Sequence, residues 1–283
     1  MFTLPDELFD RYLTQRESIG EVTYDMTHAE PNQGVMPAES PATETPSTQK
    51  SHPPSKGPRT APEEGSEQNK WRKGAPEIPP PGIEISPPSS DLFASDPLAN
   101  VDLDKLGELI RRCEQCALSR GRKNAVPGEG PPDADLMVIG EGPGANEDEQ
   151  GRPFVGRAGD LLNEILAAIG CPRETVYIAN IVKCRPPQNR NPETDEIVEC
   201  LPYLHRQIAL VKPTVILAMG GVAACTLLEY RGSLGSLRNK VHTFRGIPLV
   251  VTYHPAALLR NPNWKKPTWD DVRIARRLVA GER

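Results

Sequence analysis

Short apolar runs alternate with amphipathic segments from Val101 to the end of the chain. The runs are rich in Val and Ile, end at or near Gly, Asn, Cys or His, and occupy residues 135–140, 176–184, 214–220 and 248–255. Such runs are typical of buried strands. Between them, residues 159–170 and 192–211 have apolar side chains three and four positions apart, and Asn191 and Pro192 supply a cap and a first helical residue. The alternation predicts an α/β fold with three layers, α/β/α, around a central, mainly parallel four-stranded sheet.

The N-terminal part of the chain follows neither pattern. Residues 27–90 contain fourteen prolines among Ser, Thr, Glu, Gln and Gly, with almost no aromatic or branched apolar residue. Such a segment buries too little apolar surface to offset the entropy lost on ordering. We therefore expect a long disordered N-terminal region, with a Pro- and Ser-rich linker over residues 27–100 and one folded domain over residues 101–283.

Ahead of the linker, within residues 1–26, the stretch 4–13 has apolar side chains at helical spacing: Leu8, Phe9, Tyr12 and Leu13. It could form a short amphipathic helix, and a frayed chain end with a few apolar residues is the alternative. The stretch is too acidic and too short for a signal peptide, and no apolar run approaches the roughly twenty residues of a membrane span. We expect a soluble, cytoplasmic protein, associated with the nucleoid if the source is a prokaryote.

The formal net charge of −5 is unevenly distributed. Residues 1–100 hold 8 Lys and Arg against 16 Asp and Glu, whereas residues 101–283 hold 25 against 22. The expected domain is therefore mildly basic. That balance permits a polyanionic partner without requiring one.

Polar residues cluster towards the ends of three of the expected strands. Glu141, Asn180 and His254 stand at or near the carboxyl ends of these strands. Ligands of parallel sheets bind beyond those ends, so we expect the three side chains to meet at one site.

The stretch GEGPGANEDEQGRPFVGRAG, residues 140–159, is rich in glycine but has no lysine. It lacks the GxxxxGK[ST] pattern of a phosphate loop and the GxGxxG pattern of a dinucleotide fold. An acidic surface loop with turn glycines is one interpretation. Phe154 and Val155 argue against it, because a surface loop offers them no core. Glycines that admit a ligand closely, with Phe154 as a stacking face, favour a flat, uncharged ring such as a nucleobase.

Six cysteines occur, all after the linker. Disulfides are not expected in a chain without an export signal. Cys113, Cys116, Cys184 and Cys200 could form a four-thiolate site, which by count suits zinc or an iron–sulfur cluster equally. The alternative is a set of scattered buried thiols, and the other two cysteines, at positions 171 and 225, fit that description better.

Four motifs make the chain from about Leu103 to its end resemble the family-four uracil-DNA glycosylases, the iron–sulfur members of their superfamily. They are CEQCALSRGRKNAVPGEG, GEGPGANEDEQGRPFVGRAG, YIANIVKCRPPQNRNP and HPAALLRNP. The resemblance implies removal of uracil from single- or double-stranded DNA, leaving an abasic site for base excision repair. It also implies that Cys113, Cys116, Cys184 and Cys200 bind a structural 4Fe–4S cluster.

The resemblance assigns a role to each residue of the expected pocket. Gly140 and Gly142 would let the backbone approach the base, Phe154 would stack on it, and Asn180 would read its O4 and N3–H edge. Glu147 would sit against C5 and exclude the methyl group of thymine. The catalytic pair would be Glu141, which positions water and stabilises the cationic sugar, and His254, which donates to uracil O2.

A duplex must release its uracil into such a pocket. By the same resemblance, Leu258 and Leu259 could fill the vacated stack while Arg260 holds a phosphate, although two leucines on one turn are more often core. The further basic residues Arg157, Arg185, Arg190, Lys265 and Lys266 could contact the DNA backbone or could be solvated surface.

A sister group captures abasic DNA covalently through a basic insert that ends in His. Here residues 186–199 contain no histidine, so we expect plain hydrolysis. The rival hypothesis is a catalytically inactive nucleic-acid-binding module of the same fold. We also expect a monomer whose acidic N-terminal tail could tether a replication or repair partner.

Overall fold

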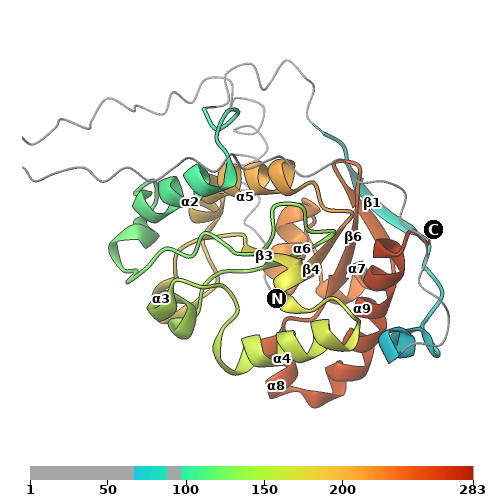
Figure 1. The fold of residues 1–283 in the computed structure, drawn as a ribbon. Helices are drawn as coiled ribbons and strands as arrows, with labels where there is room; N and C mark the ends of the chain where they lie inside the picture. Colours follow the sequence, from blue (N-terminus) through green and yellow to red (C-terminus); the bar gives the residue numbers. More distant parts are fainter. Residues whose placement is uncertain (1–66, 88–96, 283) are drawn as a thin grey trace, which may run out of the picture.

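The computed structural model describes residues 67–87 and 97–282, which form an α/β body around one six-stranded sheet (Figure 1). The strands are β1 (Pro81–Ile85), β2 (Leu136–Gly140), β3 (Val176–Asn180), β4 (Val215–Met219), β5 (Val241–Phe244) and β6 (Ile247–Thr252). Their order across the sheet is β1-β5-β6-β4-β2-β3. Strands β3, β2, β4 and β6 are mutually parallel, β5 is antiparallel to β6, and β1 is parallel to β5.

The fold class is confirmed, and the four expected strands are the four parallel ones. The sheet has two strands more than the pattern predicts. Strand β5 is only four residues long, with alternating rather than continuous burial, and it joins β6 through a tight turn at Arg245 and Gly246, both with positive φ. An apolar run does not mark such a strand, because only one of its faces contacts the core.

Helices cover both faces of the sheet. They are α2 (Leu103–Arg112), α3 (Ala145–Gln150), α4 (Gly156–Ala168), α5 (Thr194–Val211), α6 (Gly221–Leu227), α7 (Leu234–Leu237), α8 (Pro255–Arg260) and α9 (Lys265–Val279). Short 3-10 helices are η1 (Glu67–Arg72), η3 (Ala117–Arg120), η4 (Arg173–Thr175), η5 (Pro187–Asn189) and η6 (Pro262–Trp264).

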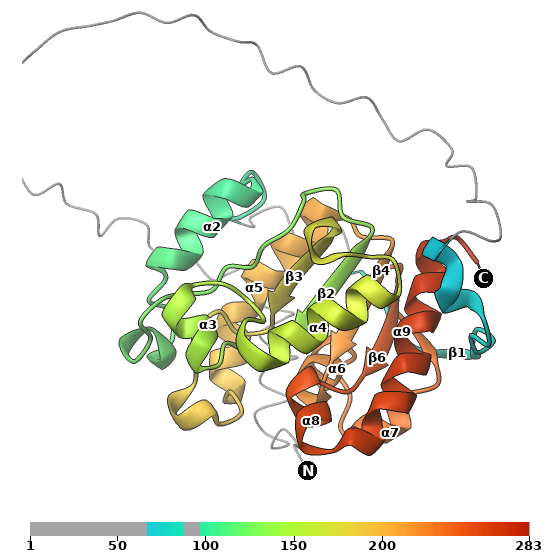
Figure 2. The same ribbon diagram turned by 60° about the horizontal axis from the view of Figure 1, so that its bottom comes forward.

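Alternate residues of each strand pack against opposite helical layers. In β2, Met137 and Ile139 join the core formed with α2, α5 and α6, whereas Leu136 and Val138 join the core formed with α4 and α9. Figure 2 shows α4 and α9 on one side of the strands and α2 and α5 on the other. Both faces are therefore buried, which explains the continuous apolar runs of the parallel strands.

Helix α5 begins at Thr194 rather than at the predicted Pro192. Glu193 occupies the cap position, and its backbone N–H donates to the Glu196 carboxylate at 2.7 Å, as in a capping box. Asn191 and Pro192 precede the helix. The predicted helical segment was right, but its cap was wrong.

Part of the expected linker is structured, so that prediction is wrong for residues 67–87. Helix η1 buries Trp71 to 2 % exposure against the α4 and α9 core, and β1 pairs with β5. The Ile83 N–H donates to His242 Nδ1 at 2.9 Å. One tryptophan and three isoleucines, Ile78, Ile83 and Ile85, pack against cores that the rest of the sheet and its helices supply. The helix predicted for residues 4–13 lies outside the described residues, as do linker residues 27–66 and 88–96.

Across residues 67–87 and 97–282, none of the helices combines the length and apolar composition needed to cross a bilayer.

Candidate active site

A cavity of about 340 Å³ opens at the carboxyl ends of β2, β3 and β6. Its lining includes residues from the strand ends, the glycine loop and α8: Glu141, Gly142, Glu147, Phe154, Asn180, His254 and Arg260. The structure therefore brings together side chains that are up to 119 positions apart in the sequence, between Glu141 and Arg260. Glu141, Phe154, Asn180 and His254 share one cavity, as expected for parallel strands whose ends meet at one edge.

Gly140, the last residue of β2, lies under two of these side chains. A Cβ atom at this position would stand 2.5 Å from Asn180 Oδ1 and 2.5 Å from Phe154 Cζ. At Gly142 it would stand 2.7 Å from Val182 Cγ2. Glycine is thus required at both positions because neighbouring side chains occupy the space of a methyl group.

Asn180 ends β3 and is only 2 % exposed. Its backbone carbonyl accepts from Lys183 Nζ at 2.7 Å, whereas its side-chain Oδ1 is buried without a hydrogen-bond partner in the part of the chain described. Leaving a buried acceptor unpaired costs about 1–3 kcal/mol. Because Asn180 lines the cavity, a ligand there that donates a hydrogen bond would recover this energy.

Phe154 forms one wall of the cavity and has an unusual backbone. Its ring stacks on the His254 imidazole, with centroids 5.2 Å apart and planes at 26°. Its φ of +49° lies in the left-handed region, which costs a phenylalanine on the order of 1–2 kcal/mol. The surrounding structure must hold this residue in place.

His254 caps α8, and this contact fixes its tautomer. Its Nδ1 accepts from the Ala256 backbone N–H at 3.2 Å, so the single proton of the neutral ring is on Nε2. Burial, assisted by the charge of Arg260, lowers the pKa of His254 to about 4. At neutral pH the residue is an uncharged imidazole with one N–H to donate.

Glu141 follows β2 and lines the same cavity. No hydrogen bond or ion pair engages its carboxylate within residues 67–87 and 97–282. Burial raises the pKa of Glu141 above its usual value. A partly buried carboxylate without a partner can accept a hydrogen bond from a water molecule and can stabilise positive charge that develops beside it.

Glu147 lines the cavity, but its carboxylate also organises the loop. One oxygen accepts from the Gly144 N–H at 3.0 Å, and the other accepts from the Val155 N–H at 2.9 Å. These bonds join the start of α3 to the residue after Phe154. Such a structural role was not predicted from the sequence, although a Glu three residues after a helix cap is its usual signature.

Leu258 and Leu259 of α8, the two candidates for filling the base stack that an extruded uracil vacates (the wedge), differ in exposure. Leu258 is 1 % exposed, so the structure does not support a DNA contact by this residue, whereas Leu259 is 43 % exposed. Adjacent residues on a helix point about 100° apart, which separates a core position from a surface position.

Trp264, at 36 %, is the other exposed large apolar side chain in residues 67–87 and 97–282. It stacks on Tyr253, with centroids 4.6 Å apart.

Of the basic residues expected at the DNA surface, Arg157, Arg260, Lys265 and Lys266 are exposed. Arg190 instead makes a bidentate ion pair with the buried carboxylate of Glu196, at 2.7 and 2.8 Å, and so belongs to the start of α5. Arg185 donates to Asn189 Oδ1 at 2.7 Å.

The four cysteines expected to act together, Cys113, Cys116, Cys184 and Cys200, line one cavity between α2, η3 and α5. Burial raises the pKa of Cys116 to about 11 and that of Cys200 to about 12, so neutralising cations would be needed to keep them as thiolates. No three His, Cys, Asp or Glu side chains of the described residues converge on one metal-ion position.

Two residues that sequence reasoning missed donate hydrogen bonds to these sulfurs, Arg122 through its side chain and Lys183 through its backbone. Arg122 donates to Cys184 Sγ at 2.9 Å, and the Lys183 backbone N–H donates to Cys200 Sγ at 3.2 Å. The Lys183 side chain is 1 % exposed, and burial lowers its pKa to about 8. Arg122 and Lys183 lie inside the quoted motifs CEQCALSRGRKNAVPGEG and YIANIVKCRPPQNRNP, but nothing in their spacing identified them. Cys171 and Cys225 do not line this cavity, and Cys171 packs in the core formed with α4 and α9.

Comparison with known families gives the class to which this fold and site belong. Residues 127–274 match the model of the uracil DNA glycosylase superfamily. The chain therefore belongs to the uracil-DNA glycosylase superfamily.

Three of the similar proteins are type-4 uracil-DNA glycosylases. The chain is 50 % identical over 170 residues to a type-4 uracil-DNA glycosylase of Pyrobaculum aerophilum, covering 57 % of this chain and 87 % of that protein. It is 44 % identical over 190 residues to the type-4 enzyme of Saccharolobus solfataricus, covering 64 % and 88 %. It is 39 % identical over 184 residues to the type-4 enzyme of Thermotoga maritima, covering 64 % and 96 %.

Proposed function

We propose that this protein is a uracil-DNA glycosylase that hydrolyses the N-glycosidic bond of uracil in single- or double-stranded DNA and leaves an abasic site for base excision repair. The main support is the meeting of Glu141, Phe154, Asn180 and His254 around one cavity. The substrate is inferred from type-4 uracil-DNA glycosylases that are 39 to 50 % identical to this chain.

Recognition of the base rests on Asn180 and Phe154. The unpaired Oδ1 of Asn180 accepts from uracil N3–H, and its amide N–H donates to O4. Cytosine presents the reverse pattern at these positions and would leave the buried amide unsatisfied. The Phe154 ring stacks on the base, and Gly140 and Gly142 leave room for it. Glu147 stands against C5, where thymine carries a methyl group.

Bond cleavage rests on His254 and Glu141. As the glycosidic bond breaks, negative charge develops on uracil O2, and the Nε2–H of neutral His254 donates to it. Positive charge develops on the sugar, which the Glu141 carboxylate stabilises while it orients the attacking water. Residues 186–199 provide no histidine for covalent capture, so hydrolysis releases the product DNA.

The exposed side chains beside the cavity form the proposed DNA surface. Leu259 fills the stack that the extruded uracil leaves, and Arg260 holds a phosphate. Trp264, backed by Tyr253 and followed by Lys265 and Lys266, offers a stacking face for a neighbouring base with cations at hand for its phosphates.

The four cysteines fit a 4Fe–4S cluster as their ligand set. When bound, the cluster would supply a covalent link between α2, β3 and α5, and hydrolysis requires no electron transfer from it. Iron and sulfide analysis with a visible spectrum of the purified protein tests this assignment. A colourless, zinc-containing protein with full activity would overturn it.

Release of free uracil from a labelled oligonucleotide is the direct test of the proposed function. U:G, U:A and single-stranded U should be processed and T:G should not. An absence of uracil release from a correctly folded protein that still binds DNA would favour the inactive binding module instead. A monomer in solution and a partner for the acidic N-terminal segment are further parts of the proposal, and sedimentation and pull-down with the full chain test them.

A further inference from the structure

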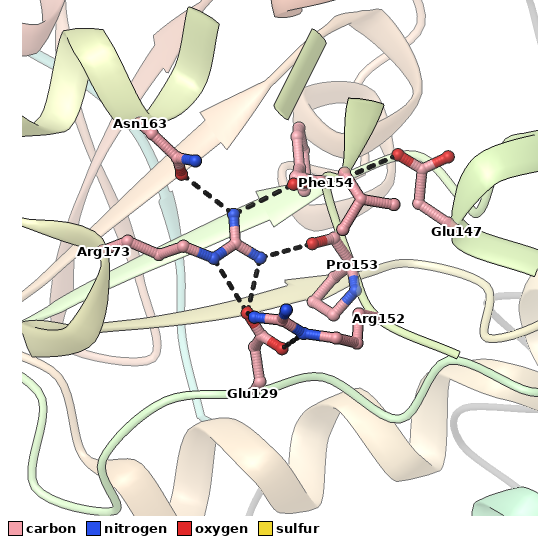
Figure 3. Close-up of polar contacts among 8 residues, drawn as sticks. Glu129, Glu147, Arg152, Pro153, Phe154, Asn163 and Arg173 are labelled. Atoms are coloured by element: carbon pink, nitrogen blue, oxygen red, sulfur yellow. Dashed lines mark hydrogen bonds and ion pairs between the residues drawn. The ribbon is translucent and has the colours of Figure 1, made fainter. Parts of the chain in front are cut away.

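Arg173, in η4, is tied to the loop that carries Phe154 (Figure 3). Its guanidinium donates to the Phe154 carbonyl at 2.9 Å, to the Pro153 carbonyl at 2.5 Å and to Asn163 Oδ1 at 3.1 Å. Two of these acceptors are consecutive backbone carbonyls. One planar guanidinium therefore holds the backbone on both sides of the Phe154 Cα atom.

Glu129 fixes the orientation of Arg173. Its Oε1 accepts from Arg173 Nε at 2.8 Å and from Nη2 at 2.5 Å, and its Oε2 accepts from Arg152 Nε at 2.8 Å (Figure 3). The Arg173 side chain is 16 % exposed, against 57 % for Arg152. The Glu129–Arg173 pair is thus shielded from water, which strengthens it relative to a surface pair.

The backbone of Glu129 is bonded to the strand that ends at Asn180. The Glu129 N–H donates to the Ile178 carbonyl at 3.0 Å, and the Ile178 N–H donates to the Glu129 carbonyl at 2.7 Å. Ile178 lies two residues before Asn180 in β3. Contacts therefore run without a break from the Asn180 strand through Glu129 and Arg173 to Phe154.

Phe154 needs such a restraint because its conformation is unfavourable by itself. Its φ is +49°, and its carbonyl oxygen occupies the space that a Cβ atom would take at Gly159. Glu147 holds the next residue, Val155, from the other side. Without the guanidinium, the two carbonyls of residues 153 and 154 would lose the donors that fix the peptide planes around Phe154.

We propose that Arg173, oriented by Glu129, is a positioning residue that sets the Phe154 ring at a fixed place relative to Asn180, so that stacking and edge recognition act on the same base. This inference rests on the proposed function for its consequence in catalysis. The placement of the ring itself is independent of that function and can be measured without substrate.

The test compares Arg173→Lys with Arg152→Gln in the full chain. Lysine keeps the positive charge but cannot bridge two carbonyls and a carboxylate. Arg152→Gln removes the other cation paired with Glu129. The Arg152 side chain makes no hydrogen bond to the Pro153 or Phe154 carbonyl, so this variant is the matched control. We expect Arg173→Lys to lower kcat/KM for uracil release by about 10- to 100-fold, the scale of an ångström of misplacement, and Arg152→Gln to change it less than about threefold.

A double variant separates positioning from general stability. If Arg173 acts through the ring, Arg173→Lys will lower kcat/KM no further in a Phe154→Ala background, although it will still lower the melting temperature. Equal losses in both backgrounds would overturn the proposal.

The His254 imidazole reports the ring position directly, because the two rings are stacked. In NMR spectra of the free protein, Arg173→Lys should move the His254 Hε1 resonance toward its position in Phe154→Ala, and Arg152→Gln should not. An unmoved resonance would overturn the proposal whatever the activity. A wild-type protein that releases no uracil would instead contradict the proposed function, and the NMR result would still decide the role of Arg173.

Discussion

The His254 imidazole is uncharged at neutral pH. Its Nδ1 lone pair accepts from Ala256, and its pKa is lowered to about 4, so the imidazole stays neutral through the physiological range. The ordinary histidine pKa is about 6.5. The unfolded chain therefore binds a proton below about pH 6.5 that the folded chain does not bind until about pH 4, and the folded state loses stability as the pH falls through that window.

This pH dependence gives the first prediction. The free energy of unfolding of the wild type should fall more between pH 7 and pH 4.5 than that of His254→Gln, as measured by urea titration. The buried His242 also has a lowered pKa, and the difference between the two proteins cancels its contribution. Parallel curves would mean that His254 titrates normally.

Glu141 gives the second prediction. Because burial raises its pKa, the active carboxylate is lost as the pH falls through a value above 4.5, and kcat/KM should fall on the acid side with it. Glu141→Gln should lower kcat by about 10²- to 10⁴-fold while uracil-DNA binding persists, and should flatten the acid limb. The matched control is Glu149→Gln, whose carboxylate is 62 % exposed and ion-paired with Lys123. If kcat/KM of Glu141→Gln still fell at low pH as in the wild type, a group other than Glu141 would cause that fall.

At the scale of the element, α8 places two neighbouring leucines in opposite environments, which gives the third prediction. Leu258→Ala should lower the free energy of unfolding by about 2–5 kcal/mol, because it empties a core position. Leu259→Ala should change stability by less than about 0.5 kcal/mol and should lower uracil release from duplex DNA more than from single strands. Thermal melts and both oligonucleotide assays check the pair. If Leu259→Ala lowered uracil release equally from duplex and single-stranded DNA, Leu259 would not fill the vacated base stack.

Helix η6 carries the fourth prediction. Trp264→Ala should leave kcat near the wild-type value and raise KM for oligonucleotides, because one stacked base is worth about 1–3 kcal/mol. Trp269, half-buried under Arg273, is the comparison residue: its replacement should lower stability instead. Steady-state kinetics at fixed salt measure the effect, and an unchanged KM would remove Trp264 from the DNA surface.

The elements that were predicted from the sequence are those with a local signature. Strands β2, β3, β4 and β6 are continuous apolar runs because both of their faces are covered, and α4 and α5 show helical spacing. Strands β1 and β5 have no such run. Strand β1 pairs with a strand far away in the sequence, Pro81 opposite Val241, and β5 is buried at alternate residues only, so neither leaves a continuous apolar run.

At the scale of the whole molecule, residues 67–87 of the N-terminal segment are part of the fold, through η1 and β1. This division gives the fifth prediction. A chain that starts just before Glu67 should keep the melting temperature of the full protein. A chain that starts after Ser90 lacks Trp71 and β1 and should lose at least about 3 kcal/mol of unfolding free energy. Calorimetry on both truncations checks this. Equal melting temperatures would show that η1 and β1 contribute nothing.

The site was predictable to the extent that its chemistry is carried by distinctive side chains. Asn180, His254, Phe154 and the four clustered cysteines are recognisable in their motifs, and the parallel sheet explains why they meet. Arg173 and Glu129 were not found, because the acceptors of Arg173 include main-chain carbonyls that every residue has. The separation of Leu258 from Leu259 also needed the fold, since only packing decides which side of α8 is covered.

Gly140 limits how the cavity could be redesigned. Any larger residue there would displace Asn180 and Phe154 together, so the floor between them cannot be altered to suit a different ring. The wall at Glu147 is equally constrained, since both of its oxygens hold the loop. Engineering toward bulkier lesions would therefore have to begin on the α8 side, at Ala256, whose methyl group makes no hydrogen bond.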